Sequence, residues 1–178
     1  MYPVIRLFTQ LIKHRNDPPL AITDTHVSRH RCLPWDIDLW LELNNGRTLT
    51  LYDLGRTTAA QRVGLIKVLR RNRWGLTMAG ASVRYRRRIR TFEKFEMRSR
   101  LAWWDDKFFY VEQSMWKRNG ECANHIVYRS AVTGSAGIIV PQQVVEEIDA
   151  QTIRPPAPEW IAAWIKAETK RPWPPMQE

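Results

Sequence analysis

The sequence predicts an α+β fold in which a long central helix is wrapped by a curved antiparallel sheet. Three observations lead to this prediction. A strand-like segment precedes a long stretch with helical periodicity, several strand-like segments follow it in close succession, and turn signals separate those segments. Consecutive strands joined by tight turns form an antiparallel meander, and a helix with a wide apolar stripe must be covered on more than one side.

The first half of the chain supplies one strand and the helix. Residues 22–33 are rich in Thr and Val, stop before Pro34 and read as a strand. Residues 36–46 form a connecting loop. From residue 47 to about residue 71, apolar side chains recur at three- and four-residue steps, which predicts one long helix or two helices broken near Gly64.

The second half reads as a run of strands followed by two short helices. Asp105-Asp106 and Asn119-Gly120 are turn signals between alternating segments. We expect strands over residues 76–89, 92–104, 108–117 and 121–133, and short helices over residues 141–150 and 159–170.

The length fits one domain with a sizeable core. The chain has 178 residues, of which 44% are hydrophobic and 26% charged, as in ordinary soluble globular proteins. No internal repeat and no low-complexity linker divides it. We expect a single domain over residues 1–178, with its core at about residues 22–133 and an extension at each end.

The N-terminal segment, residues 1–15, carries several apolar side chains interrupted by Arg6. It is too short and broken for a membrane span, and it lacks the charged start and small-residue cleavage site of a secretory signal. A short amphipathic helix fits the pattern, and packing on its own domain is favoured over lying on a membrane.

The two cysteines, Cys32 and Cys122, form no CxxC pair, so neither a zinc knuckle nor a dithiol redox motif is expected. One disulfide stays open as an alternative, but two reduced thiols in a cytoplasmic protein are favoured. His26, His30 and His125 are scattered without further ligands, so we expect structural histidines and no metal.

The formal net charge is +10, from 28 basic and 18 acidic residues, which favours a polyanionic partner. Nucleic acid, an anionic membrane and a phosphorylated ligand all fit. No nucleic-acid motif accompanies the charge, so we expect no nucleic acid partner. In a strand, Arg84, Arg86, Arg88 and Arg90 share one face while Arg87 points the other way. They form either a phosphate clamp or a solvated, edge-protecting face.

The strongest candidate chemistry lies between residues 35 and 47. Asp38 follows an extended segment, and Asn44, Asn45 and Gly46 open the helix. This order can place a carboxylate beside the unpaired N–H groups of a helix start. The carboxylate can activate water, and the amides can stabilise negative charge on a carbonyl oxygen. An ordinary turn and helix cap is the alternative, since these residue types favour both.

These residues resemble the hotdog-fold acyl-CoA thioesterases, most closely the 4-hydroxybenzoyl-CoA thioesterase-like group. The motif of that group is an Asp, a Gly-His-Val/Met-Asn-Asn run and a Tyr in the helix. Asp38 stands at the motif's Asp, and Asn44 and Asn45 stand at its asparagines. Glu42 replaces the His and Thr48 replaces the Tyr. The similarity continues through residues 51–56, 82–87 and 95–105, and it covers about residues 24–133.

The resemblance implies a hotdog domain that hydrolyses an acyl-CoA thioester to a carboxylic acid and coenzyme A, without a cofactor or metal. Asp38 would be the nucleophile or general base, with Asn44, Asn45 and Gly46 as the other catalytic residues. Two such subunits usually join their sheets, so a homodimer or homotetramer is implied, with the sites at the interface.

For substrate binding, the expected residues are Arg84, Arg86 and Arg87, with Glu42 and Asp53 as further carboxylates near the site. The two departures from the motif, Glu42 and Thr48, also leave an alternative. It is a non-catalytic hotdog module that binds acyl-CoA or a protein partner.

Overall fold

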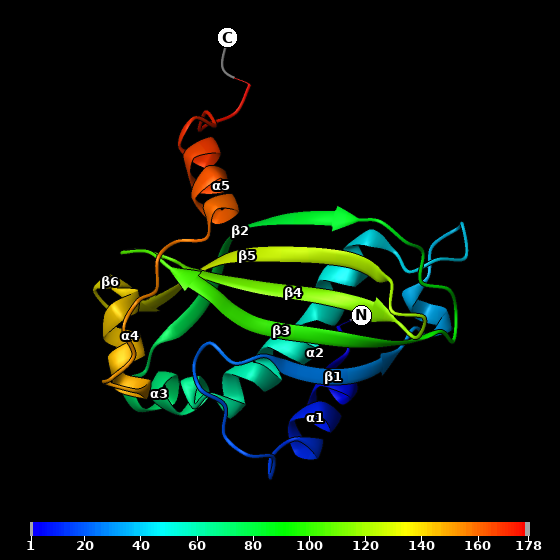
Figure 1. Ribbon diagram of the computed structural model, residues 1–178, viewed down its shortest axis with the longest axis horizontal. Helices are drawn as coiled ribbons and strands as arrows, with labels where there is room; N and C mark the ends of the chain where they lie inside the picture. Colours follow the sequence, from blue (N-terminus) through cyan, green and yellow to red (C-terminus); the bar gives the residue numbers. More distant parts are fainter. Residues whose placement is uncertain (1, 177–178) are drawn as a thin grey trace.

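The computed structural model describes residues 2–176, and its helices and strands confirm the α+β prediction (Figure 1). The elements of the first half are α1 (Val4–Lys13), β1 (His26–Arg31), the 3₁₀ turn η1 (Pro34–Asp36), α2 (Asn45–Arg62) and α3 (Leu65–Asn72). Those of the second half are β2 (Gly75–Tyr85), β3 (Lys94–Trp104), β4 (Phe109–Lys117), β5 (Cys122–Gly134), β6 (Gly137–Ile139), α4 (Pro141–Ile148) and α5 (Glu159–Thr169).

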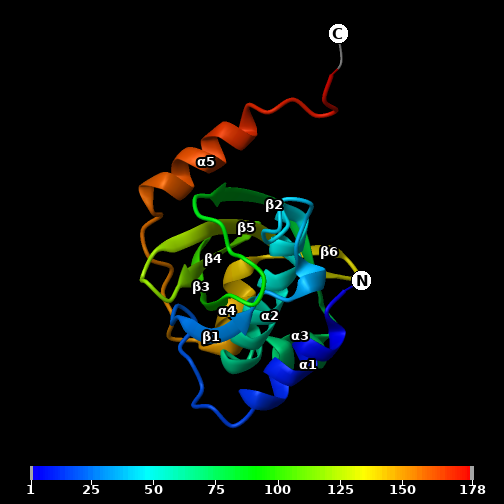
Figure 2. The same cartoon turned by 90° about the vertical axis from the view of Figure 1, so that its right-hand side faces the viewer.

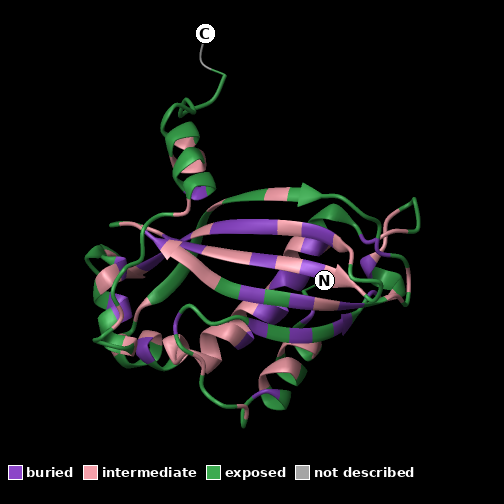
Figure 3. Ribbon diagram, in the orientation of Figure 1, coloured by how far each residue is buried: buried purple, intermediate pink, exposed green. Residues whose placement is uncertain are grey.

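The sheet is antiparallel throughout and follows the order β1-β3-β4-β5-β2, with β6 paired to β5 beside this path. It curves around α2, which Figure 2 shows close to end-on inside the curve. Strands β1 and β3 alternate buried and exposed residues, because one face of the sheet packs on α2 (Figure 3). Strand β2 lies at an end of this path and is mostly exposed.

Helix α2 lies close against the sheet at Gly55. A Cβ atom there would come within 2.5 Å of both Met97 Sδ and Ser99 Oγ on β3, so only glycine allows this approach. A buried hydrogen-bond network fixes the same contact. Gln113 Nε2 donates to the carbonyl of Tyr52 at 3.0 Å and to Ser99 Oγ at 2.7 Å, while the Tyr52 hydroxyl donates to the side chain of Asn124. The middle of α2 is therefore held against β3, β4 and β5.

Of the two alternatives for residues 47–71, the structure has two helices, because Gly64 adopts φ +86° and separates α2 from α3. The predicted strand over residues 76–89 is wrong at its end, because β2 stops at Tyr85. The N–H groups of Arg86 and Arg87 both donate to the carbonyl of Ala123, which ends the regular ladder. The next residues turn to the loop before α2, where the Leu43 N–H donates to the carbonyl of Ile89.

The N-terminal segment forms the amphipathic helix α1, which packs alongside α2 as expected. Leu7 lies against the main core, and Gln61 Nε2 donates to the carbonyl of Leu11 at 3.2 Å. The opposite face of α1 leaves Ile5 83% exposed. Within residues 2–176, none of the helices combines the length and apolar character needed to cross a bilayer.

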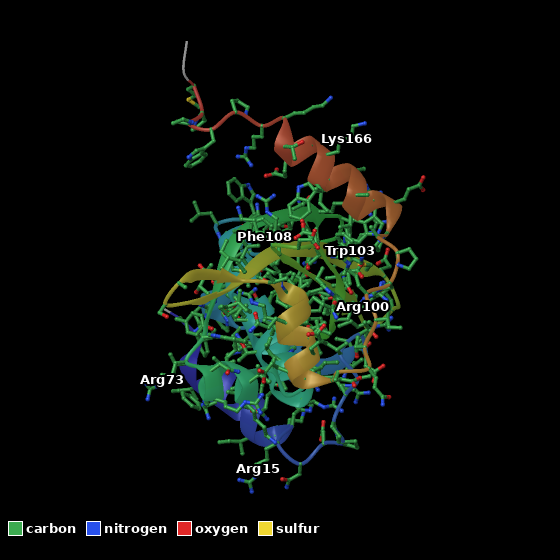
Figure 4. The ribbon with its side chains drawn as sticks, turned by 90° about the vertical axis from the view of Figure 1, so that its left-hand side faces the viewer. Arg15, Arg73, Arg100, Trp103, Phe108 and Lys166 are labelled. Atoms are coloured by element: carbon green, nitrogen blue, oxygen red, sulfur yellow. The ribbon has the colours of Figure 1, made fainter. Side chains whose placement is uncertain are left out.

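The C-terminal helix α5 covers part of the outer face of the sheet. Ile161 is fully buried against Tyr110 and Val127, and Trp103 and Phe108 pack around this contact (Figure 4). One apolar face of α5, formed by Ile161, Trp164 and Ile165, therefore covers the sheet.

Two buried histidines predict a loss of stability in mild acid. Burial, together with neighbouring positive charge, lowers the pKa of His26 to about 4 and that of His30 to about 3. Arg62 Nη1 lies 3.1 Å from His26 Nδ1, so a proton on that ring is disfavoured. Since an unfolded histidine titrates near 6.5, only the unfolded chain binds these protons below that pH.

The free energy of unfolding should therefore fall as pH drops from about 6.5 towards 5, by up to about 1.4 kcal/mol per pH unit for each histidine. Urea unfolding at several pH values between about 6.5 and 5 measures this change in the free energy of unfolding. The variant His30→Gln should show a shallower slope than the parent. An unchanged slope in His30→Gln would contradict the assignment.

Candidate functional site

The start of α2 has an N-cap and two backbone amides without an acceptor inside the helix. Asn44 is the N-cap, and its Oδ1 accepts the N–H of Arg47 at 2.9 Å. The amides of Asn45 and Gly46 come earlier in this first turn, where a helix has no carbonyl one turn back to accept them. Residues 44–46 thus form a helix cap and leave two backbone amides without an acceptor inside the helix, as at helix starts that bind anions.

Asp38 lies in a tight turn directly before this helix start. Its Oδ1 accepts the Trp40 N–H at 2.9 Å and approaches the Glu42 N–H at 3.5 Å, and its own N–H donates to the carbonyl of Glu42. One carboxylate oxygen therefore caps the turn. Its Oδ2 makes no hydrogen bond within residues 2–176. The tip of the turn exposes Leu39 and Trp40 to solvent.

The fully buried carboxylate of this region is Asp36, two residues before Asp38. Its Oδ2 accepts from Arg6 Nη1 at 2.6 Å and from the Leu33 N–H at 3.0 Å, and its Oδ1 accepts from Arg47 Nε at 2.7 Å. Its backbone carbonyl accepts the N–H of Asn44 at 3.0 Å. Asp36 thereby ties α1, η1 and the start of α2 together, which is a structural role.

On one side of the α2 start lies a largely apolar hollow of about 1040 Å³, here called the α1 hollow. Apolar side chains from α1 and η1 line it, together with Asp36 and its ion-pair partners Arg6 and Arg47. Its lining residues are Tyr2, Pro3, Val4, Ile5, Arg6, Trp35, Asp36, Ile37, Asn44, Arg47 and Thr50.

On the other side lies a smaller hollow of about 220 Å³, here called the arginine hollow. Three consecutive arginines from the segment after β2 line it together with the first turn of α2. Its lining residues are Glu42, Leu43, Asn45, Thr48, Tyr85, Arg86, Arg87, Arg88, Ile89 and Asn124. The Tyr85 hydroxyl donates to the carbonyl of Asn45 at 3.1 Å and so joins β2 to the helix start.

The two residues that depart from the motif both have partners inside the protein. Glu42 forms an ion pair with Arg88, with Nε and Oε2 2.7 Å apart. The buried Thr48 donates its hydroxyl to the carbonyl of Asn44 at 3.0 Å, one turn earlier in the helix. Glu42 thus sets the position of an arginine at the hollow, and the Thr48 hydroxyl is engaged by the helix.

The predicted single face of alternating arginines is wrong. Only Arg84 belongs to β2, because the strand ends at Tyr85, and Arg84 lies outside the arginine hollow. Arg86 and Arg87 line the hollow together, and Arg87 also pairs with Glu121 at 3.0 Å.

Asp53 lies further along α2, where it pairs with Arg56, and it lines neither hollow. The structure therefore gathers Glu42, Asn45, Arg86 and Arg87 at the arginine hollow and leaves Asp53 and Arg84 elsewhere. Asn44 lines the α1 hollow, whereas Asp38 and Gly46 lie at the start of α2 without lining either hollow. Across residues 2–176, no three His, Cys, Asp or Glu side chains are grouped so that they could hold a metal ion. Both cysteines are free thiols.

Sequence reasoning missed four residues of this region: Arg6, Trp35, Asp36 and Tyr85. A local signal did exist for Asp36, since Pro34 followed two residues later by an acidic residue is a common helix-start pattern. No local signal marks Arg6 or Tyr85, whose contacts join segments 30 and 40 residues apart.

Comparison with known proteins gives a family match over most of the chain. The model of the thioesterase-like superfamily matches residues 32–165. Protein THEM6 of Xenopus laevis is 35% identical over 136 residues, which make up 75% of this chain and 64% of that protein. The chain thus spans slightly less than two thirds of the length of this curated relative.

Solved structures show the same fold at low sequence identity. The probable thioesterase YbaW from Escherichia coli superposes with a TM-score of 0.64 at 12% identity, over 68% of this chain and 94% of that one. The hypothetical protein SAV2348 from Staphylococcus aureus, solved in complex with CoA, gives a TM-score of 0.61 at 11% identity, over 80% of this chain and 94% of that one. The predicted hotdog fold is confirmed.

Proposed function

Because the chain belongs to the thioesterase-like superfamily, we propose that it hydrolyses an acyl-CoA thioester at the start of α2, giving a carboxylic acid and coenzyme A. The observation that carries this proposal is the arrangement around the first turn of the helix. Amide donors at Asn45 and Gly46 lie between an apolar hollow and an arginine-lined hollow, and Asp38 lies in the turn before them. An acyl-CoA has the matching parts, which are an apolar acyl group, a thioester and a phosphorylated nucleotide.

In this mechanism the thioester oxygen accepts hydrogen bonds from the backbone N–H groups of Asn45 and Gly46. These hydrogen bonds stabilise the negative charge of the tetrahedral intermediate. Asp38 acts through its unused Oδ2, either as general base for a water molecule or as nucleophile at the thioester carbon. The carbon–sulfur bond then breaks. In the general-base route, the leaving sulfur of coenzyme A takes up the proton that Asp38 removed from water, and the carboxylic acid is released directly. In the nucleophilic route, coenzyme A leaves as its thiolate and the acyl group stays on Asp38 as a mixed anhydride, which water then hydrolyses to the carboxylic acid and free Asp38. Arg86 and Arg87 attract the phosphate groups of the coenzyme.

We further propose that the protein forms a homodimer through strand β2. This strand is 11 residues long, lies at an end of the sheet and exposes Leu76 and Met78. A long, partly apolar edge strand is a template for pairing with a second copy, which would continue the sheet across both subunits. A reducing compartment such as the cytoplasm fits the two free thiols.

The test of the proposed function is a panel of acyl-CoA thioesters with detection of the free thiol that hydrolysis releases. Acyl groups of different length and aromatic character belong in the panel, because the acyl group is not fixed by the motif. We expect turnover with at least one member and none with CoA ethers, which lack the reactive carbonyl. A panel without any thiol release would contradict hydrolysis.

A substitution at Gly46 separates ligand approach from folding. An alanine Cβ there would lie 3.4 Å from Asn44 Oδ1, an ordinary contact, so Gly46→Ala should fold with equal or slightly greater stability. If the thioester oxygen approaches the Gly46 amide, the added methyl group should reduce kcat/KM by roughly 100-fold, as loss of one oxyanion donor does. Thermal unfolding and thiol release measure the two effects, and full turnover in Gly46→Ala would place the oxyanion elsewhere.

A second function is favoured by one observation, the pairing of Glu42 with Arg88 at the position where the related motif has a histidine. With Asp38 Oδ1 engaged in its turn, the same hollows fit a module that binds acyl-CoA without hydrolysing it. Calorimetry discriminates the two functions. Saturable binding of an intact acyl-CoA, with no thiol released over hours, supports the binding module.

A further inference from the structure

We propose that the α1 hollow holds the acyl group of the thioester, an apolar hydrocarbon chain or ring, so that helix α1 sets the acyl preference. This inference rests on the proposed function and adds a binding site to it. Helix α1 spans Val4–Lys13, which lies outside the residues 32–165 that match the family model. The wall is therefore a feature of this chain beyond the matched region.

The position of the hollow supplies the first reason. Asn44, Arg47 and Thr50 from the first turns of α2 line it, whereas Asn45 lines the arginine hollow instead. A thioester carbonyl bound at the helix start therefore has one hollow on each side. Since the arginines suit the phosphates, the acyl group points towards α1.

The chemistry of the walls supplies the second reason. Val4, Ile5 and Trp35 present apolar side chains to the hollow, and Ile5 and Trp35 are 83% and 69% exposed. The charged groups below them are already paired, because Asp36 accepts from both Arg6 and Arg47. An uncharged hydrocarbon removes the exposed apolar surface from water without breaking these ion pairs.

The size and the limits of the hollow supply the third reason. A volume of about 1040 Å³ is at the upper end of small-molecule sites, which typically measure about 300–1,000 Å³. The next exposed apolar residues of α1, Phe8 and Ile12, lie further along the helix and do not line the hollow. Within α1, only the first turn therefore contributes to the site. Phe8, further along the same helix, provides a control residue outside it.

The experiment measures the affinity of non-hydrolysable S-alkyl-CoA ethers of increasing chain length by calorimetry. The parent protein should gain affinity with each methylene group, by at most about fourfold per group. The variants Ile5→Ser and Trp35→Ala should each reduce this gain in affinity, because each removes an apolar side chain that lines the hollow. Phe8→Ser also removes an exposed apolar side chain of α1, with Phe8 59% exposed against 83% for Ile5, but Phe8 lies outside the hollow, so this variant should keep the gain of the parent. Size-exclusion chromatography with light scattering reports the oligomeric state of each variant.

Equal gains per methylene in Ile5→Ser and the parent would overturn the acyl site, as would an equal loss in Phe8→Ser. A change of oligomeric state in Ile5→Ser with an unchanged gain would also overturn it, since a second copy would then cover the hollow. Thiol release from acyl-CoA is measured separately. If affinity depends on alkyl chain length but no thiol is released, the acyl site is supported and hydrolysis is refuted. If thiol is released but affinity does not depend on chain length, hydrolysis is supported and the acyl site is refuted.

Discussion

Replacing Asp38 with asparagine should reduce acyl-CoA turnover by about 100- to 10,000-fold while leaving the fold intact. Asparagine keeps a carbonyl oxygen that can accept the Trp40 N–H, so the turn before α2 retains its cap. What the variant loses is the negative charge and the proton-accepting Oδ2. The loss should appear in kcat more than in the affinity for S-alkyl-CoA ethers, because the substitution removes chemistry and leaves both hollows unchanged.

The matched control for this variant is Asp24→Asn. Asp24 also caps an exposed turn, where its Oδ2 accepts the Ala21 N–H at 2.9 Å. It precedes β1, whose first residue, His26, contacts Arg62 at the opposite end of α2 from the candidate site. It should turn over acyl-CoA at the parent rate. Equal rates in Asp38→Asn and the parent would remove Asp38 from the mechanism.

Replacing Asp36 with alanine should lower the free energy of unfolding by about 3–5 kcal/mol, the usual cost of removing one partner of a buried ion pair. Asp36 is fully buried, and the side chains of its partners Arg6 and Arg47 are only 20% and 14% exposed. The variant removes the carboxylate that both guanidinium groups and the Leu33 N–H share as an acceptor. Urea unfolding measures the change.

An ion pair at the surface gives the comparison for Asp36→Ala. Asp106 pairs with Arg154 at 2.7 Å, but the Asp106 side chain is 89% exposed. Asp106→Ala should change the free energy of unfolding by less than about 1 kcal/mol. A similar small effect for Asp36→Ala would mean that the contacts between α1, η1 and α2 do not depend on this carboxylate.

The two neighbouring carboxylates show what the sequence could and could not reveal. The spacing of Asp38 to Asn44 and Asn45 identified the loop and the helix start correctly, because a turn and a helix cap are local structures. The burial of Asp36 depends on Arg6, which lies 30 residues earlier, and no local pattern predicts such a contact. Tertiary packing therefore decides that Asp36 is buried and that Asp38, two residues later, is not.

The arginine segment shows a second limit of the same kind. Alternation predicted a continuous strand through Ile89, but β2 ends where two consecutive N–H groups share the carbonyl of Ala123. The following residues pair with the loop before α2, as the Glu42–Arg90 bridge shows. Charged residues carry little strand periodicity, so the end of the strand could not be located from their spacing. The helical stretch of residues 47–71, for which a break near Gly64 was one of two alternatives, and the meander rest on stronger patterns and were predicted correctly.

The most direct test of the account is a crystal structure of the protein with a non-hydrolysable acyl-CoA analogue that retains a carbonyl group. We expect the carbonyl oxygen within hydrogen-bond distance of the Asn45 or Gly46 amide, the Asp38 carboxylate facing the adjacent carbon, and the phosphates near Arg86 and Arg87. A ligand bound away from the start of α2, with Asp38 turned into bulk solvent, would contradict the account.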